Sequence, residues 1–133
     1  MAFTWTKDLE TGNALIDTEH KKLIQAADEL VAACSQGKGR QEIGKAVDFL
    51  SSYTKTHFGH EEELQVKHKY PDYSVHKNWH QGYIKQIENV ASKLKTEGAT
   101  IALVAEVNTK VSELLTHIKT FDKKLAQFVN SAQ

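Results

Sequence analysis

Apolar residues recur along most of this chain at spacings of three and four positions, which is the period of an amphipathic α-helix. Leu23, Ala27 and Leu30 show the pattern in the first such stretch. The spacing predicts four helices, over residues 17–36, 41–66, 73–96 and 100–130. No stretch of any length alternates between apolar and polar residues as a half-buried strand does, so we expect an all-α fold.

Residues that favour turns separate the predicted helices. Gly37 and Gly39 follow the first helix, and Pro71 precedes the third, where its fixed φ suits a helix start. Gly98 ends the third helix, and Thr100 is the expected N-cap of the fourth. Because connections this short force neighbouring helices to run antiparallel, the expected architecture is an up-down-up-down four-helix bundle.

The length of 133 residues fits one domain with a core of its own. We find no internal repeat, linker or low-complexity tract that would divide the chain. Residues 1–12 precede the first predicted helix and hold Trp5 and Leu9. We expect these residues to lie as an N-terminal arm across the bundle.

The composition argues against several classes of partner. Lys plus Arg and Asp plus Glu both number 17, so the net charge is zero and favours neither nucleic acid nor an anionic membrane surface. The first residues do not form a secretory signal, and no stretch approaches the ~20 apolar residues that span a bilayer. The one cysteine, Cys34, is interpreted as a packing residue and permits no intrachain disulfide. We therefore expect a soluble, cytoplasmic protein.

The chain contains seven histidines, and several of them lie at positions suited to binding a metal. His57 and Glu61 are four positions apart in the second helix, and His76 and His80 are four apart in the third. Each pair projects from one helix face, on the apolar stripe. His20 takes an inward position on the first helix. Any one of these residues alone would more often be a satisfied core residue than a ligand, so the weight lies in the joint pattern.

His117 and Asp122 complete the pattern on the fourth helix. They are five positions apart, or about 140° around the axis of an α-helix, so we expect them to reach one central cavity from its two sides. Burying all seven groups without partners would cost several kcal/mol each. A metal cluster compensates all of them at once, and the pattern therefore predicts a metal site with donors from every helix.

The motifs resemble those of a known family. They run from Trp5 through Gly12 and Asp17 to His20, then His57-Phe58-x-x-Glu61-Glu62, Tyr70-Pro71-Asp72-Tyr73, His76-x-x-x-His80 and His117-Ile118-x-x-x-Asp122. Over nearly the whole chain, this is the pattern of a bacterial hemerythrin. The resemblance implies an iron ion held by His76, His80 and His117, and a second held by His20 and His57. It implies that Glu61, Asp122 and an oxo or hydroxo group bridge the two.

The predicted ligands leave one coordination place on the two irons unfilled. Two six-coordinate irons offer about twelve places, and imidazole together with carboxylate suits iron. Five histidines, two bridging carboxylates and one bridging oxygen fill all but one of them. By resemblance, dioxygen binds reversibly at that place on the iron of His20 and His57. We nominate Leu23, Phe58 and Leu114 as core residues that also shape the dioxygen pocket.

Other polar residues near the motifs are interpreted as non-ligands. Glu62 and Glu63 are expected to face solvent, and His60 and His68 lie off the ligand positions. Glu113 departs from the family, whose members often carry tryptophan there. We favour a solvent-facing Glu113, but an inward one would make the pocket wetter and favour peroxide chemistry.

Three functions stay open at this point. The first is a binding protein, not an enzyme, that carries, stores or buffers dioxygen. The second is a di-iron oxidoreductase of peroxidase or nitric-oxide-handling type, for which Glu113 is the only support in the sequence. The third is an oxygen or redox sensor, which would need a separate protein partner because no signalling domain is attached. The sequence identifies no such partner.

Overall fold

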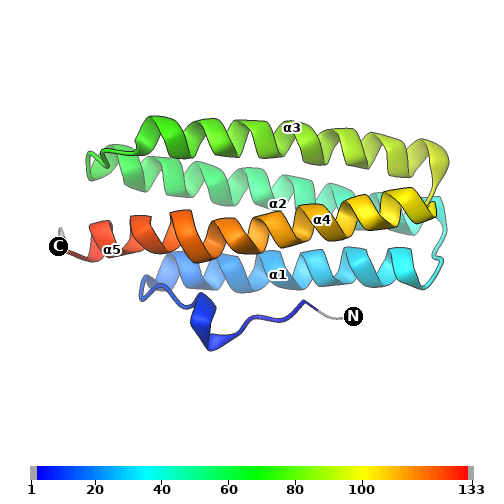
Figure 1. Ribbon diagram of the computed structural model, residues 1–133, viewed down its shortest axis with the longest axis horizontal. Coiled ribbons are helices and arrows are strands. Elements are labelled where there is room, and N and C mark those ends of the chain that lie inside the picture. The colour runs from blue at the N-terminus through cyan, green and yellow to red at the C-terminus, as the bar shows by residue number, and fades with distance from the viewer. Residues whose placement is uncertain (1–2, 132–133) are drawn as a thin grey trace.

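The computed structural model describes residues 3–131, so residues 1 and 2 of the predicted arm lie outside the described range. Five α-helices and a π-helical turn form the four rods of a bundle (Figure 1). The helices are α1 (Ala14–Ser35), α2 (Arg40–Lys67), α3 (Tyr73–Glu97), α4 (Ile101–His117) and α5 (Lys123–Ser131). The π-helical turn η2 (Ile118–Asp122) joins α4 to α5, and the described residues contain no strand. The predicted all-α four-helix bundle is confirmed.

Caps explain where the helices begin and end. The first helix starts at Ala14, earlier than predicted, because the side-chain oxygen of Asn13 accepts a hydrogen bond of 3.1 Å from the Ile16 amide. The Thr100 hydroxyl accepts a hydrogen bond of 3.1 Å from the Leu103 amide, which confirms it as the N-cap of α4. Gly98 ends α3 with φ +77°, a conformation that favours glycine.

The apolar core fills the bundle on both sides of a polar layer. Along α1, Ile16 packs in a cluster at one end of the bundle and Leu23 in a larger cluster towards the other. His20 lies between them and is fully buried. Cys34 packs in the larger cluster, in agreement with its interpretation as a packing residue.

The described residues before α1 lie beside that helix (Figure 1). They contain the short 3₁₀ helix η1 (Lys7–Leu9), and Leu9 is buried against the core. The Phe3 amide donates to Asp28 Oδ1 on α1 at 2.8 Å, and Lys21 Nζ lies 4.6 Å from the centre of the Trp5 ring. No helix in the described part of the chain is both long and apolar enough to cross a membrane.

Candidate metal centre

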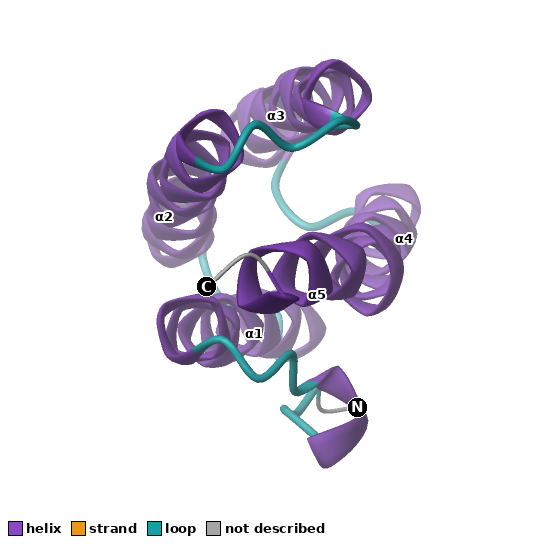
Figure 2. Cartoon of the chain, turned by 90° about the vertical axis from the view of Figure 1, so that its left-hand side faces the viewer, coloured by secondary structure: helices purple, strands orange, loops and turns teal. Residues whose placement is uncertain are grey.

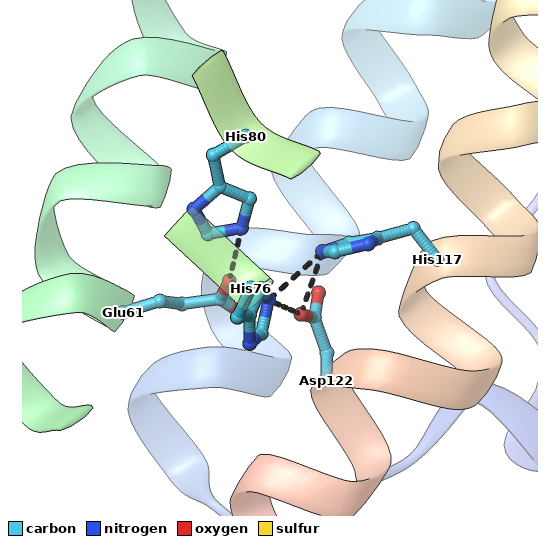
Figure 3. Close-up of side chains that lie close together, drawn as sticks. All are labelled: Glu61, His76, His80, His117 and Asp122. Carbon is cyan, nitrogen blue, oxygen red and sulfur yellow. Dashed lines mark hydrogen bonds and ion pairs between the residues drawn. The ribbon is translucent and has the colours of Figure 1, made fainter. Parts of the chain in front are cut away.

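All seven predicted donor residues meet in the polar layer, and each side chain is almost completely buried. Their donor atoms form two groups, and the atoms of each group all lie within 4.8 Å of one another. The larger group contains Glu61, His76, His80, His117 and Asp122 (Figure 3). The smaller group contains His20, His57, Glu61 and Asp122. Because both groups share the two carboxylates, they form two adjacent candidate cation sites.

Glu61 stands between the two groups and turns one oxygen to each. Its Oε2 lies 3.1 Å from Nε2 of His57 and 3.5 Å from Nε2 of His20. Its Oε1 lies 3.3 Å from Nε2 of His80 and 3.7 Å from Nε2 of His76. A carboxylate placed in this way can bridge two cations.

Asp122 divides its oxygens in the same manner. Its Oδ2 lies 2.9 Å from Nε2 of His20, in the smaller group. Its Oδ1 lies 3.1 Å from Nε2 of both His76 and His117, in the larger group. Both carboxylates therefore contribute one oxygen to each of the two donor groups.

The π-helical turn corrects the expected geometry of His117 and Asp122. An α-helix would separate residues five apart by about 140°, and we expected them to enter the cavity from two sides. In η2 the hydrogen bonds run from residue i to i+5, so five positions make slightly more than one full turn. Both side chains consequently point into the cavity from the same face of the rod (Figure 3).

The unpaired atoms of the cluster test whether metal ions fit. Among the described residues, Nε2 of His57 and of His80, both oxygens of Glu61 and Oδ1 of Asp122 are buried without a hydrogen bond. Each such atom costs about 1–3 kcal/mol if nothing satisfies it. Shared cations would satisfy them together, and imidazole with carboxylate is a ligand set for iron. The residues therefore fit a pair of iron ions.

Electrostatics favour the charged form of the carboxylates. Burial alone would raise the pKa of Asp122, but the close imidazoles of His117, His20 and His76 hold it well below its ordinary value. The pKa of Glu61 is also lowered, because His57 and His20 outweigh its burial and the neighbouring anion. Burial lowers the pKa of His117, which favours the neutral imidazole that metals bind.

Three histidines of the cluster are oriented by hydrogen bonds at Nδ1, the ring nitrogen that faces away from the centre. His57 Nδ1 donates to Glu19 Oε1 at 2.8 Å, and His80 Nδ1 donates to Glu62 Oε2 at 2.9 Å. His76 Nδ1 accepts a hydrogen bond from Gln65 Nε2 at 3.1 Å. Such bonds fix the ring so that Nε2 faces the centre.

These orienting residues were not identified from the sequence. Glu62 was expected to be solvated, and this is wrong because it is partly buried against His80. Glu19 is buried and also contacts His60, which lies outside both donor groups and is partly exposed. Gln65 lies four positions after Glu61 on the inward stripe of α2, and that spacing could have revealed it.

Aromatic rings enclose the centre. Phe58 stacks on His80 with ring centroids 3.7 Å apart and planes at 5°. Trp79 stacks on His117 with centroids 3.8 Å apart and planes at 14°. Leu23, Phe58 and Leu114, the residues nominated for the dioxygen pocket, are all buried. Their role in a pocket stays a prediction.

Comparison with known proteins decides the family. The model of the hemerythrin HHE cation binding domain matches residues 11–129, a range that contains all seven donors. The chain belongs to the hemerythrin family. The resemblance predicted from the sequence motifs is confirmed, and the described cluster fits the metal site expected of this family.

Three relatives show how far the similarity extends. Bacteriohemerythrin of Stenotrophomonas maltophilia is 30% identical over 128 residues, which cover 96% of this chain and 81% of that protein. Bacteriohemerythrin of Pseudomonas aeruginosa is 34% identical over 83 residues, which cover 62% of this chain and 54%, or about half, of that protein. Myohemerythrin of Sipunculus nudus is 25% identical over 122 residues, covering 92% and 89% of the two chains.

Proposed function

We propose that this hemerythrin holds two iron ions and binds dioxygen reversibly at one of them, as a carrier, store or buffer. His76, His80 and His117 would hold one ion, His20 and His57 the other, and Glu61, Asp122 and an oxo or hydroxo group would bridge them. The observation that carries the proposal is the inequality of the two donor groups, five residues against four. At six places per iron, only the smaller group leaves a place for a small ligand.

The protein's own residues give this centre its surroundings. Two ferrous ions supply the two electrons that bound dioxygen accepts and returns. Glu19 accepts a hydrogen bond from His57 Nδ1 and so holds the ring with Nε2 towards the proposed iron that binds dioxygen. Leu23, Phe58 and Leu114 would exclude water from the bound ligand, which slows the loss of electrons to solvent-borne oxidants.

We also propose binding rather than enzymatic turnover. The alternative of peroxidase or nitric-oxide chemistry depended on an inward Glu113. Its side chain is 45% exposed and its carboxylate pairs with Lys110 Nζ at 3.1 Å, which supports a solvent-facing Glu113. A cytoplasmic location is part of the proposal, supported by a single cysteine, Cys34, that is buried and unpaired.

An anaerobic–aerobic absorption spectrum combined with metal analysis tests this function. We expect about two irons per chain, because the donors form two sites. Air admitted to the reduced protein should produce a ligand-to-metal charge-transfer band that disappears under vacuum. Zinc without iron would reject the metal assignment, and a band that never forms, or that forms and cannot be reversed, would reject reversible dioxygen binding.

A further inference from the structure

A groove of about 700 Å³ runs between α3 and α4, on the side where these two helices lie apart (Figure 2). This volume is in the range of small-molecule sites. Trp79 and Tyr83 form its α3 wall, and Ser112 and Glu113 line it from α4. The groove also reaches His117, so it touches a residue of the metal centre.

Stacked rings connect the groove with that centre. Tyr83 stacks on Trp79 with centroids 4.9 Å apart and planes at 10°. Trp79 in turn stacks on His117 at 3.8 Å, and Phe121 stacks on His117 at 4.8 Å. Overlapping π systems in van der Waals contact couple well for electron transfer. A flat ligand against Trp79 would therefore lie one indole ring away from a candidate iron ligand.

The groove lies on the side of the centre that has no open place. His117 belongs to the five-residue donor group. Together with the proposed oxo or hydroxo group, these five residues would fill the six places of one iron. A molecule in the groove would therefore exchange electrons with the centre and would not coordinate it. Dioxygen, in contrast, needs the group of His20 and His57.

The lining selects an uncharged ligand. Glu113 is the one carboxylate among the described residues that line the groove, and the lining contains no ammonium or guanidinium group. Lys110 neutralises Glu113 from outside the lining, at 3.1 Å. Flavin nucleotides and other phosphate-bearing carriers would find no free cation here. The side-chain amide of Asn78 suits the oxygens of a neutral ring.

We propose that the α3/α4 groove binds a neutral quinol, which returns an oxidised centre to its reduced state through Trp79 and His117. The inference rests on the proposed function, since only the ferrous centre would bind dioxygen. The quinol loses two electrons and two protons and becomes the quinone. Two ferric ions held by the seven donor residues would accept these two electrons, and both protons would leave to solvent through the open groove. A two-electron donor thus matches a two-iron centre.

The first test measures binding and requires no activity. The iron-loaded protein is dialysed to equilibrium against 2-methyl-1,4-naphthoquinone, with the variants Ser112→Trp and Ser112→Ala beside it. The added indole should fill the groove and weaken binding by about tenfold or more, whereas Ser112→Ala should bind like the unchanged protein. Equal binding by Ser112→Trp and the unchanged protein, or no binding by either, would overturn the proposal.

The second test follows electron delivery by anaerobic stopped-flow, with 2-methyl-1,4-naphthoquinol as the donor to the ferric protein. Reduction should slow by about tenfold or more in Ser112→Trp and in Trp79→Leu, and Trp79→Phe should restore most of the rate by keeping a stacked ring. Unchanged rates in Ser112→Trp would overturn the proposal. Should Trp79→Leu lose iron, Ser112→Trp decides alone.

The two proposals fail in different ways. A reversible dioxygen band in a protein that binds no quinone leaves the proposed function in place and removes the groove's role. A protein that binds the quinone and accepts electrons from the quinol, but never forms the band, keeps the groove's role and loses the dioxygen function.

Discussion

At the scale of single residues, the central feature is that the two oxygens of each buried carboxylate face different donor groups. Glu61 and Asp122 each turn one oxygen to the His20 side of the centre and the other to the His76 side. Each is thus placed to bridge two cations, and the pair would supply the carboxylate charge shared by both donor groups. Removing one of them should leave bound cations poorly neutralised in a buried place.

Replacing Glu61 with alanine should lower metal content and thermal stability together, because a bridge and an anion are lost at once. Metal analysis and a thermal melt of the purified variant measure both. Glu63→Ala is the matched control, since Glu63 lies on the same helix but is exposed. Full retention of iron and melting temperature by Glu61→Ala would contradict the assignment of Glu61 as a bridge.

Glu19→Gln should weaken metal binding by about ten- to a hundredfold, which is typical for the loss of a partner that orients a metal-binding histidine. The amide keeps the shape of the side chain but removes the charge that holds His57 Nδ1–H. Competition with a chelator measures the affinity, and Glu29→Gln on the exposed face of α1 is the control. Equal affinities in the two variants would show that Glu19 is not needed to orient His57.

Helical spacing was enough to predict which residues meet at the centre, but not what holds them in place. The pairs His57–Glu61 and His76–His80 follow from the i,i+4 geometry of one helix. Glu19 acts on His57 from a different helix, so no local spacing could reveal the contact. Which way an intermediate position such as Glu62 turns depends on the neighbouring helix, and the prediction that it is solvated failed for that reason.

At the scale of secondary-structure elements, the π-helical turn is the feature that sequence periodicity did not predict. Residues Ile118–Asp122 differ in no evident way from an ordinary α-helical stretch, since a π turn adds one residue without a characteristic composition. Helix ends were more predictable, because Gly98 and Thr100 carry known capping preferences. Packing around the centre, rather than local preference, must therefore stabilise η2.

Two glycine substitutions should change stability in opposite directions. Gly98→Ala places a side chain at φ +77° and should lower the free energy of unfolding by about 1 kcal/mol. Gly59→Ala lies inside α2, where an added Cβ meets nothing within 4 Å, and should raise it by about 0.5–1 kcal/mol. Urea denaturation of the two variants measures both changes. A stabilised Gly98→Ala would contradict the described end of α3.

At the scale of the whole molecule, the centre buries seven ionisable side chains in the core. In the metal-free protein these groups can be satisfied only by one another and by protons. Burial alone would lower the pKa of His57, but Glu61 and Glu19 raise it to about 10. The stability of the metal-free fold should consequently depend on pH in a manner that the iron-loaded fold does not share.

The free energy of unfolding of the chelated protein should fall as the pH rises from about 6.5 to 10. In that window the folded protein keeps the His57 proton, whereas unfolded histidine, with a pKa of about 6.5, has lost it. The loss should be on the order of 2 kcal/mol by pH 9. Urea denaturation at pH 6.5 and 9 measures it, and equal or greater stability at pH 9 would contradict the raised pKa.

The same chelated protein should also lose stability in acid. The pKa values of Glu19, Glu61 and Asp122 are lowered in the fold, so these carboxyls stabilise it above about pH 4 and cease to do so as the pH falls further. Stability should therefore be greatest between about pH 4 and 6.5. Iron loading should remove the alkaline slope, because the metal occupies the nitrogen that the proton would hold.

The position of the donors along the chain has a consequence for the order of events during synthesis. His20 and Asp122, which face each other at 2.9 Å, are 102 positions apart. A ribosome must synthesise and release the chain through residue 122 before the Asp122 carboxylate can reach His20. A complete iron site can therefore form only after all four rods have been synthesised. Before iron binds, the rods must pack around buried carboxylates and imidazoles that have no metal ion between them.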